Sequence, residues 1–94
     1  MPETKGHNEV LTRTFKKNDE SYDLLVSEPQ QADSGEFWTK VTLERDSDIV
    51  WSHQIAGIDG VQSTLLALGL ARKLLESDGG FTFLDDADLM LPDF

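Results

Sequence analysis

The residues most able to carry chemistry are a histidine in an alternating segment and two small groups of side chains. His53 is of the type that most often serves as a catalytic acid or base. A nucleophilic pair would place a serine or threonine within hydrogen-bond reach of His53. Ser52 precedes it in a segment of strand periodicity and therefore points to the opposite face. We interpret His53 as structural and assign no catalytic residue.

Acidic side chains near the C-terminus are the second candidate, because clustered carboxylates attract Ca²⁺. Asp85, Asp86 and Asp88 lack the alternating acids, the glycine and the distal glutamate of an EF-hand loop. Residues 46–48, Asp-Ser-Asp, form too short a segment to surround an ion. The sequence therefore predicts no metal site and no cofactor. Asp85, Asp86 and Asp88 are instead candidates for contact with a protein partner.

A glycine-bracketed segment, residues 57–60, separates an expected strand from an expected helix, where phosphate-binding loops occur. It lacks further glycines and a basic residue, and Asp59 would repel an anion. Asp59 is better placed as the N-cap of the helix, with Gln62 completing a capping box. The segment is interpreted as a helix start.

Size and composition narrow the class of protein. A chain of 94 residues forms one domain, and without cysteine it has neither disulfides nor thiolate metal sites. The first residues lack the apolar run of a signal peptide, and no stretch approaches the roughly 20 apolar residues that span a bilayer. We expect a cytoplasmic protein.

The charge balance is the strongest compositional feature, with 18 acidic residues against 8 basic ones and a net charge of −10. Binding to nucleic acid or to an anionic membrane needs clustered lysine and arginine. The adjacent basic pairs in this chain are Lys16-Lys17 and Arg72-Lys73. The excess of acid suits either solubility or attraction to a basic protein.

Four segments have the composition and periodicity of β-strands: 9–16, 22–27, 36–45 and 49–56. The last two constrain each other. A three-residue loop, residues 46–48, pairs Leu43 with Trp51 and gathers the apolar side chains on one face, whereas a loop of two or four residues scatters them. In this register Trp38 lies on the outer face among polar residues, where an exposed aromatic side chain is a candidate binding anchor.

One long helix is predicted over residues 59–77, ending at Gly79-Gly80. Apolar side chains cover about half of its circumference, enough to lie on a sheet: Val61, Leu65, Ala67, Leu68, Ala71, Leu74 and Leu75. Leu66 and Leu70 lie beyond the polar stripe of this helix, so a second contact should cover them. We expect that cover to come from the segment around Phe81 and Phe83, with a partner or second subunit as the alternative.

The last residues mix aspartates with leucine, methionine and phenylalanine. Such mixing occurs in disordered segments that fold on binding. The alternative is a short edge strand at residues 81–84 followed by a frayed end.

The stretch 57–68, after a strand that carries a tryptophan, resembles a signature of small uncharacterised bacterial domains. In those domains a Gly-Ile/Val-Asp-x-x-Gln-Ser/Ala segment opens a Leu/Ala-rich helix behind an antiparallel sheet. The resemblance covers about residues 36–77, and Gly60 departs from a pattern that often has serine. It implies a sheet-plus-helix fold and a bacterial origin, and it brings no assigned activity.

The predicted fold is α+β: a four-stranded antiparallel β-meander with one long α-helix packed on one face, and a short C-terminal strand or arm. The domain spans residues 9–84, between a disordered arm at 1–8 and an acidic tail at 85–94. The favoured function is a non-enzymatic protein-binding module, such as a bacterial immunity or inhibitor protein that neutralises a basic partner. The alternatives are a structural homo-oligomer, with a homodimer through Leu66 and Leu70, and an enzyme that uses His53 with a loop acid.

Overall fold

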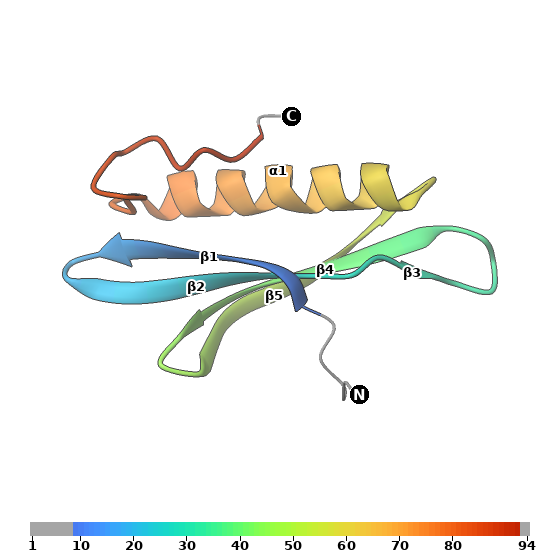
Figure 1. Ribbon diagram of the computed structural model, residues 1–94, viewed down its shortest axis with the longest axis horizontal. Coiled ribbons are helices and arrows are strands. Elements are labelled where there is room, and N and C mark those ends of the chain that lie inside the picture. The colour runs from blue at the N-terminus through green and yellow to red at the C-terminus, as the bar shows by residue number, and fades with distance from the viewer. Residues whose placement is uncertain (1–8, 93–94) are drawn as a thin grey trace.

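Five β-strands and one long helix make up residues 9–92, the part of the chain that the computed structural model describes (Figure 1). The expected N-terminal arm, residues 1–8, lies outside this range. The elements follow in the order β1 (Glu9–Lys17), β2 (Glu20–Ser27), β3 (Gln30–Gln31), β4 (Phe37–Arg45), β5 (Asp48–Gly57) and α1 (Gly60–Asp78). The predicted α+β class and antiparallel meander are confirmed, with one strand more than expected.

β4 lies inside the sheet and organises it. It pairs along its length with β5 on one side, while β2 and the short β3 share the other side. β1 pairs with β2, so β1 and β5 are the two edges. The extra strand, β3, falls in the predicted polar loop, whereas at residues 81–84 Thr82 makes an isolated bridge to Lys16 of β1.

Two-residue turns join β1 to β2 and β4 to β5. Asn18 and Asp19 have φ angles of 53° and 64°, and Asp46 and Ser47 have φ angles of 51° and 69°. Two consecutive residues with positive φ give the turn whose twist matches that of the flanking strands, and Asn and Asp tolerate this conformation better than most residues. Polar turn chemistry therefore fixes both hairpins.

The predicted register of β4 and β5 is confirmed: Leu43 lies opposite Trp51 and Val41 opposite His53. The predicted three-residue loop is wrong, because the turn has two residues and a bulge leaves Val50 without a partner. The bulge supplies the one-residue shift that the longer loop would have given. Pairing of apolar side chains on one face thus determines the register, and the strand adapts to the turn.

The ends of α1 follow local signals that the sequence predicts. Asp59 has an extended backbone and its Oδ1 accepts a hydrogen bond from the Gln62 amide at 2.8 Å. The Gln62 side chain reaches one residue further back than in a capping box, and its Oε1 accepts a hydrogen bond from the Ile58 amide at 2.8 Å. Gly79, with φ of 81°, ends the helix as its amide donates to the Leu75 carbonyl.

The face of α1 that packs on the sheet (Figure 1) is made largely of small residues. Ser63 and Ala67 are fully buried, whereas Val61 and Leu65 are 70% and 39% exposed. The Ser63 hydroxyl lies 2.7 Å from the Thr39 hydroxyl of β4. Small side chains let the helix approach the sheet closely. The buried face of α1 is therefore determined by side-chain size and by this hydrogen bond as well as by hydrophobicity. The predicted burial of Val61 and Leu65 is therefore wrong.

The C-terminal arm, defined as residues 79–92, turns back at the end of α1 and returns along the molecule (Figure 1). Phe81, Leu89 and Leu91 are buried and belong to the same core as the sheet and helix. The Phe81 ring packs edge-on against Tyr22, with centroids 5.1 Å apart. The part of the predicted acidic tail that the structure describes, residues 85–92, thus packs against the domain.

Candidate functional site

Three tight turns and the C-terminus of α1 meet at one end of the molecule, on the left in Figure 1. The turns are Asn18-Asp19, Asp46-Ser47 and, in the arm, Leu84-Asp85, and all six residues have positive φ. In an antiparallel meander every second connection falls at the same end. Both hairpin turns and the end of the helix are therefore brought together by the topology.

Ion pairs between these segments tie the same end together. Lys17 Nζ lies 2.9 Å from Asp78 Oδ2 at the end of the helix, and Arg45 Nη1 lies 3.2 Å from Glu20 Oε1. We call this region the acidic end and define it by its carboxylates: Asp19, Glu20, Asp46, Asp48, Asp78, Asp85 and Asp86. Of these residues, Asp85 and Asp86 were predicted as candidates for partner contact and the other five were not. The alternation of connections along the meander is the signal that indicates the hairpin-turn residues among them.

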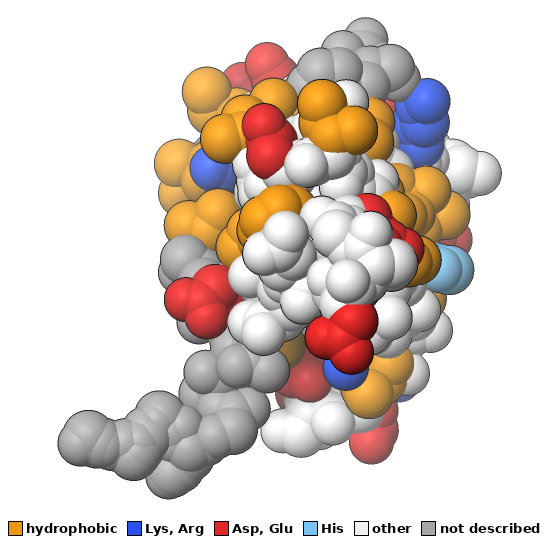
Figure 2. Space-filling view, turned by 90° about the vertical axis from the view of Figure 1, so that its right-hand side faces the viewer, with side chains coloured by type: hydrophobic (Ala, Val, Ile, Leu, Met, Phe, Trp, Pro, Cys, Tyr) orange, Lys and Arg blue, Asp and Glu red, His pale blue; other side chains and the backbone are white. Residues whose placement is uncertain are grey.

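The acidic end is negative for a second reason. Its helix terminus carries the negative pole of the helix dipole, and no basic residue lies in the last turn of α1. Arg72, about two turns before the end of α1, donates to Glu76 Oε2 at 3.0 Å and to the Leu91 carbonyl at 2.8 Å. Figure 2 views the opposite end, where acidic side chains are separated by hydrophobic and uncharged ones.

Two of the three predicted binding aspartates in the arm also shape it. Asp86 Oδ1 accepts a hydrogen bond from the Asp88 amide and Asp88 Oδ1 accepts one from the Met90 amide, each at 2.9 Å. Such bonds to the backbone two residues ahead form Asx turns. Asp85, Asp86 and Asp88 are all exposed, so their carboxylates face solvent while the turns hold them in place.

Two arginines on different elements hold the arm by its backbone. Arg13 of β1 donates through Nη1 to the carbonyl oxygens of Leu89, at 3.1 Å, and Met90, at 2.8 Å. Its guanidinium also lies 4.4 Å from the ring centroid of Phe83. Arg72 of α1 binds the next carbonyl, that of Leu91. The arm is thus fixed to the sheet and to the helix at the same time.

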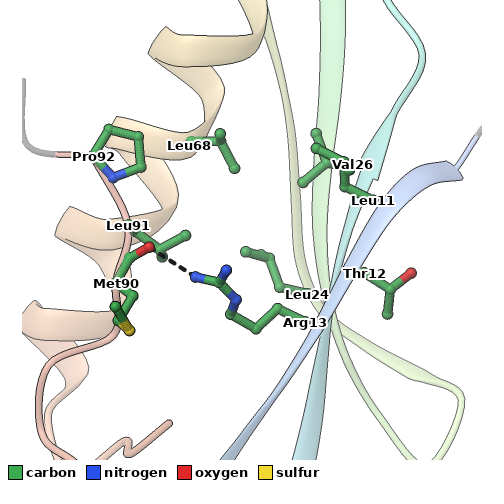
Figure 3. Close-up of a pocket in the computed structure, with 9 residues that line it drawn as sticks. All are labelled: Leu11, Thr12, Arg13, Leu24, Val26, Leu68, Met90, Leu91 and Pro92. Atoms are coloured by element: carbon green, nitrogen blue, oxygen red, sulfur yellow. Dashed lines mark hydrogen bonds between the residues drawn. The ribbon is translucent and has the colours of Figure 1, made fainter.

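A pocket of about 170 Å³ remains beside the end of the arm (Figure 3). Figure 3 shows Arg13 reaching from β1 toward the arm, with Leu24 and Leu68 facing the same space from the sheet and the helix. Among residues 9–92, Arg13 is the one charged residue that lines the pocket, and its guanidinium is already bonded to the arm. We attribute this pocket to the packing of the arm.

The predicted cover of Leu66 and Leu70 by the C-terminal segment is wrong. The arm contacts Leu68 and Arg72, each two residues further along, which places it about 200° around the helix from Leu66 and Leu70. Leu66 is 38% exposed and Leu70 is half-buried. We call these two residues the Leu66–Leu70 flank.

Trp38 lies on the outer face of the sheet, as predicted, and is 36% exposed. Its neighbours across the sheet are Gln30 of β3 and Ala56 of β5. Trp38 is therefore accessible from solvent on the face opposite α1, and its role as a binding anchor stays a prediction.

His53 lies on the helix side of the sheet opposite Val41, and it is exposed because β5 is an edge strand. Its ring centroid is 5.7 Å from that of Trp51. Ser52 lies on the other face, as predicted, 2.9 Å from the Thr42 hydroxyl. Within residues 9–92, no group of three or more histidine or acidic side chains is placed to hold a metal ion, and no helix is long and apolar enough to span a membrane.

Hydrogen bonds and nearby charges favour the ionised forms of two side chains, Glu36 and Arg45. A hydrogen bond from Ser34 lowers the pKa of Glu36, with smaller contributions from the Glu36 amide and from Trp38. Hydrogen bonding to Tyr22, together with the charge of Glu20, raises the pKa of Arg45. Both groups keep their full charge at neutral pH, so neither is tuned to exchange a proton during catalysis.

Comparison of the sequence with family models and with curated proteins, and of the fold with solved structures, found no match. The resemblance of residues 57–68 to small bacterial domains therefore stays a prediction.

Proposed function

We propose that this protein is a non-enzymatic binding module whose acidic end binds a basic surface of a partner protein, as a bacterial immunity or inhibitor protein would. The observation that carries the proposal is the convergence of both hairpin turns, the turn of the arm and the negative pole of α1 at that end. Charges gathered on one side of a molecule steer an oppositely charged partner and raise its association rate.

The backbone that carries several carboxylates of the acidic end lies in closed turns, which favours binding. Asp19, Asp46 and Asp85 lie in turns with positive φ that are closed by paired strands or by a backbone bridge. Binding therefore orders little of the backbone that presents them. Three cations lie at this end against its seven carboxylates: Lys17 and Arg45 are in internal ion pairs, and Lys16 is exposed on β1.

A basic protein fits this surface better than other classes of ligand. The carboxylates are distributed over three turns, so they suit several lysines and arginines spread over a partner surface rather than one bound ion. The sign of the charge disfavours nucleic acid and anionic lipid. The proposal treats His53 as a structural residue, exposed on β5 beside Trp51, with the Ser52 hydroxyl on the other face against Thr42.

The experiment begins with a search for the partner among the products of neighbouring genes, followed by kinetic measurement with the purified pair. In the variant Asp19→Asn, Asp46→Asn, Asp85→Asn, asparagine keeps the positive φ of each turn and removes only the charge. We expect its association rate at low salt to be at least about tenfold lower than that of the unmodified chain. Raising the salt concentration should slow the unmodified chain toward the variant.

A matched control removes the same charge at the other end. The variant Glu28→Gln, Asp33→Asn, Glu36→Gln changes three acids in and beside the β2–β4 connection. Its association rate should stay within about twofold of the unmodified rate, because these residues are far from the acidic end. An association rate that ignores salt, or one that both triple variants reduce equally, contradicts the proposal.

A further inference from the structure

The packing of the C-terminal arm leaves a pocket of about 170 Å³ beside residues 90–92 (Figure 3). Pairing of β1 with β2 sets Leu11 opposite Val26 and Arg13 opposite Leu24, so these four side chains lie on one face of the sheet. Leu68 of α1 faces the same space from the helix. The wall formed by the sheet and the helix is therefore mainly apolar, and it includes the guanidinium of Arg13.

The size of the pocket suits a group of about six carbon atoms, because an apolar cavity of about 150 Å³ in a protein holds a benzene molecule. Leu24 and Val26 are buried, whereas Leu11 and Met90 are 49% and 65% exposed. The pocket is thus deepest against β2 and open between β1 and the arm. A small molecule can enter it from solvent without opening the core.

Arg13 is held in place while part of its guanidinium stays available. Its Nη1 donates to the Leu89 and Met90 carbonyls, and the guanidinium lies 4.4 Å from the ring centroid of Phe83. A guanidinium carries five N–H donors in a planar fork. The hydrogen bonds of Arg13 to residues 9–92 are all made through Nη1, so Nε and Nη2 keep three donors for another acceptor.

The charge of Arg13 is also not neutralised by a carboxylate of residues 9–92. The ion pairs in this part of the chain are made by Lys17, Arg45 and Arg72. Asp88, the acid of the arm next to the pocket lining in sequence, is exposed, and its Oδ1 accepts a hydrogen bond from the backbone. Because a guanidinium binds a carboxylate through two parallel N–H···O bonds, a ligand carboxylate complements the free edge of Arg13.

We propose that this pocket binds a small apolar carboxylate, a monocarboxylic acid with a chain or ring of about six carbon atoms. The apolar group packs against Leu24, Val26 and Leu68, and the carboxylate accepts hydrogen bonds from Nε and Nη2 of Arg13. The net charge of −10 opposes an anion mainly at low salt, because salt screens exposed carboxylates more than about 10 Å away, whereas the contact with Arg13 is direct.

A ligand in this pocket should also strengthen the docking of the arm. The pocket is lined by residues 90–92 of the arm together with residues of β1, β2 and α1, so the ligand contacts all four segments at once. Release of the arm removes one wall of the site. Ligand binding and arm docking therefore favour each other.

The first test is titration of the full chain with hexanoate, followed through the amide resonances by NMR spectroscopy. We expect saturable shifts at residues 24, 26, 68 and 90–92, with a dissociation constant on the order of 1 mM for a ligand of about eight heavy atoms. Hexanol and hexylammonium lack the carboxylate, and acetate lacks the apolar chain. Each should bind at least about tenfold more weakly, and equal binding of any of the three overturns the proposal.

The second test changes the pocket while keeping the fold. Leu68→Phe places a larger side chain in the pocket, and Arg13→Lys keeps the charge and a donor for the arm but removes the two-bond fork. Each should weaken hexanoate binding at least about fivefold, the lysine variant through the two-bond contact and the phenylalanine variant through lost space. Leu66→Phe enlarges a residue on the Leu66–Leu70 flank and should change the dissociation constant by less than about twofold. Unchanged binding in both pocket variants overturns the proposal.

Limited proteolysis tests the coupling to the arm. At ten times its dissociation constant, hexanoate should slow cleavage within residues 85–92 about tenfold, because cleavage proceeds from the ligand-free state with the arm released. The same concentration of acetate provides the control. Saturable binding of hexanoate without this protection places the ligand outside the pocket and overturns the proposal.

This site and the proposed function can fail independently. The residues that line the pocket in the described part of the chain include none of the carboxylates that define the acidic end. Loss of salt-dependent partner binding therefore leaves the hexanoate titration unaffected, and failure of the titration leaves the acidic end unaffected.

Discussion

The contact between helix and sheet depends, at the scale of single residues, on a buried pair of hydroxyl groups. Thr39 and Ser63 are both fully buried and their hydroxyl oxygens are 2.7 Å apart. Ser63 also donates to the Gly60 carbonyl at 3.3 Å, and Gly57 lies so close that an added Cβ would sit 2.5 Å from the Ser63 amide nitrogen. The helix therefore packs closely on the sheet near the junction of β5 and α1 for two reasons: the residues there are small, and the buried hydroxyl groups are hydrogen-bonded to each other.

Removing either hydroxyl should destabilise the fold, and removing both should cost less than the sum. We expect Ser63→Ala and Thr39→Val each to lower the free energy of unfolding by about 1–2 kcal/mol, because each leaves its partner less well bonded in the core. The coupling in the double variant should be about 1 kcal/mol in urea denaturation. Ser77→Ala, at an exposed helix position, corrects for the helix propensity of alanine. Additive single effects would show that the two hydroxyls do not depend on each other.

Residue types predict some of these details and miss others. The cap at Asp59 and the stop at Gly79 follow from interactions within a few residues, so they are readable in the sequence. The exposure of Val61 and Leu65 could not be predicted from the sequence. Hydrophobic periodicity shows which residues share the apolar half of the helix, but not which part of that half lies closest to the sheet.

At the scale of elements, the C-terminal arm completes the core that the strands and helix begin. Phe81, Leu89 and Leu91 are buried, although Leu89 and Leu91 belong to the predicted acidic tail, which mixes aspartates with apolar residues. The arm is held by Arg13 and Arg72, which come from distant parts of the chain. The ordered conformation of the arm therefore depends on tertiary contacts, which no local sequence pattern predicts.

Loss of both arginines should release the arm while leaving the sheet and helix folded. We expect limited proteolysis to cut within residues 85–92 at least about tenfold faster in Arg13→Ala, Arg72→Ala, because hydrogen bonds from a charged donor each contribute about 1.5–3 kcal/mol. The control Lys16→Ala, Lys73→Ala removes two exposed cations from the same two elements. Equal cleavage in the two double variants would show that burial of the arm, and not the arginines, holds it.

At the scale of the whole molecule, seven carboxylates and the negative pole of α1 lie at one end. Like charges held close together in the folded state oppose folding. The same arrangement that steers a basic partner is therefore expected to lower the stability of the isolated chain.

Salt should raise the thermal midpoint of this protein. We expect an increase of about 4–8 °C between low and high salt, which corresponds to about 1 kcal/mol for a domain of this size. The variant Asp19→Asn, Asp46→Asn, Asp85→Asn should melt higher at low salt and respond less to added salt. The variant Glu28→Gln, Asp33→Asn, Glu36→Gln provides the comparison, and an equal loss of salt dependence in both would show that the repulsion is not concentrated at the acidic end.

Features that arise from neighbouring residues or from one repeating pattern could be predicted from the sequence. These are the α+β class, the boundaries of α1, the position of Trp38 and the register in which Leu43 faces Trp51. Capping, turn chemistry and strand alternation act over a few residues, so their outcome is visible before folding. Which face of α1 is buried, on which flank the arm lies and which turns lie at the same end all follow from tertiary packing. Those results depend on distances between segments far apart in the chain, which close packing sets and a linear pattern does not contain.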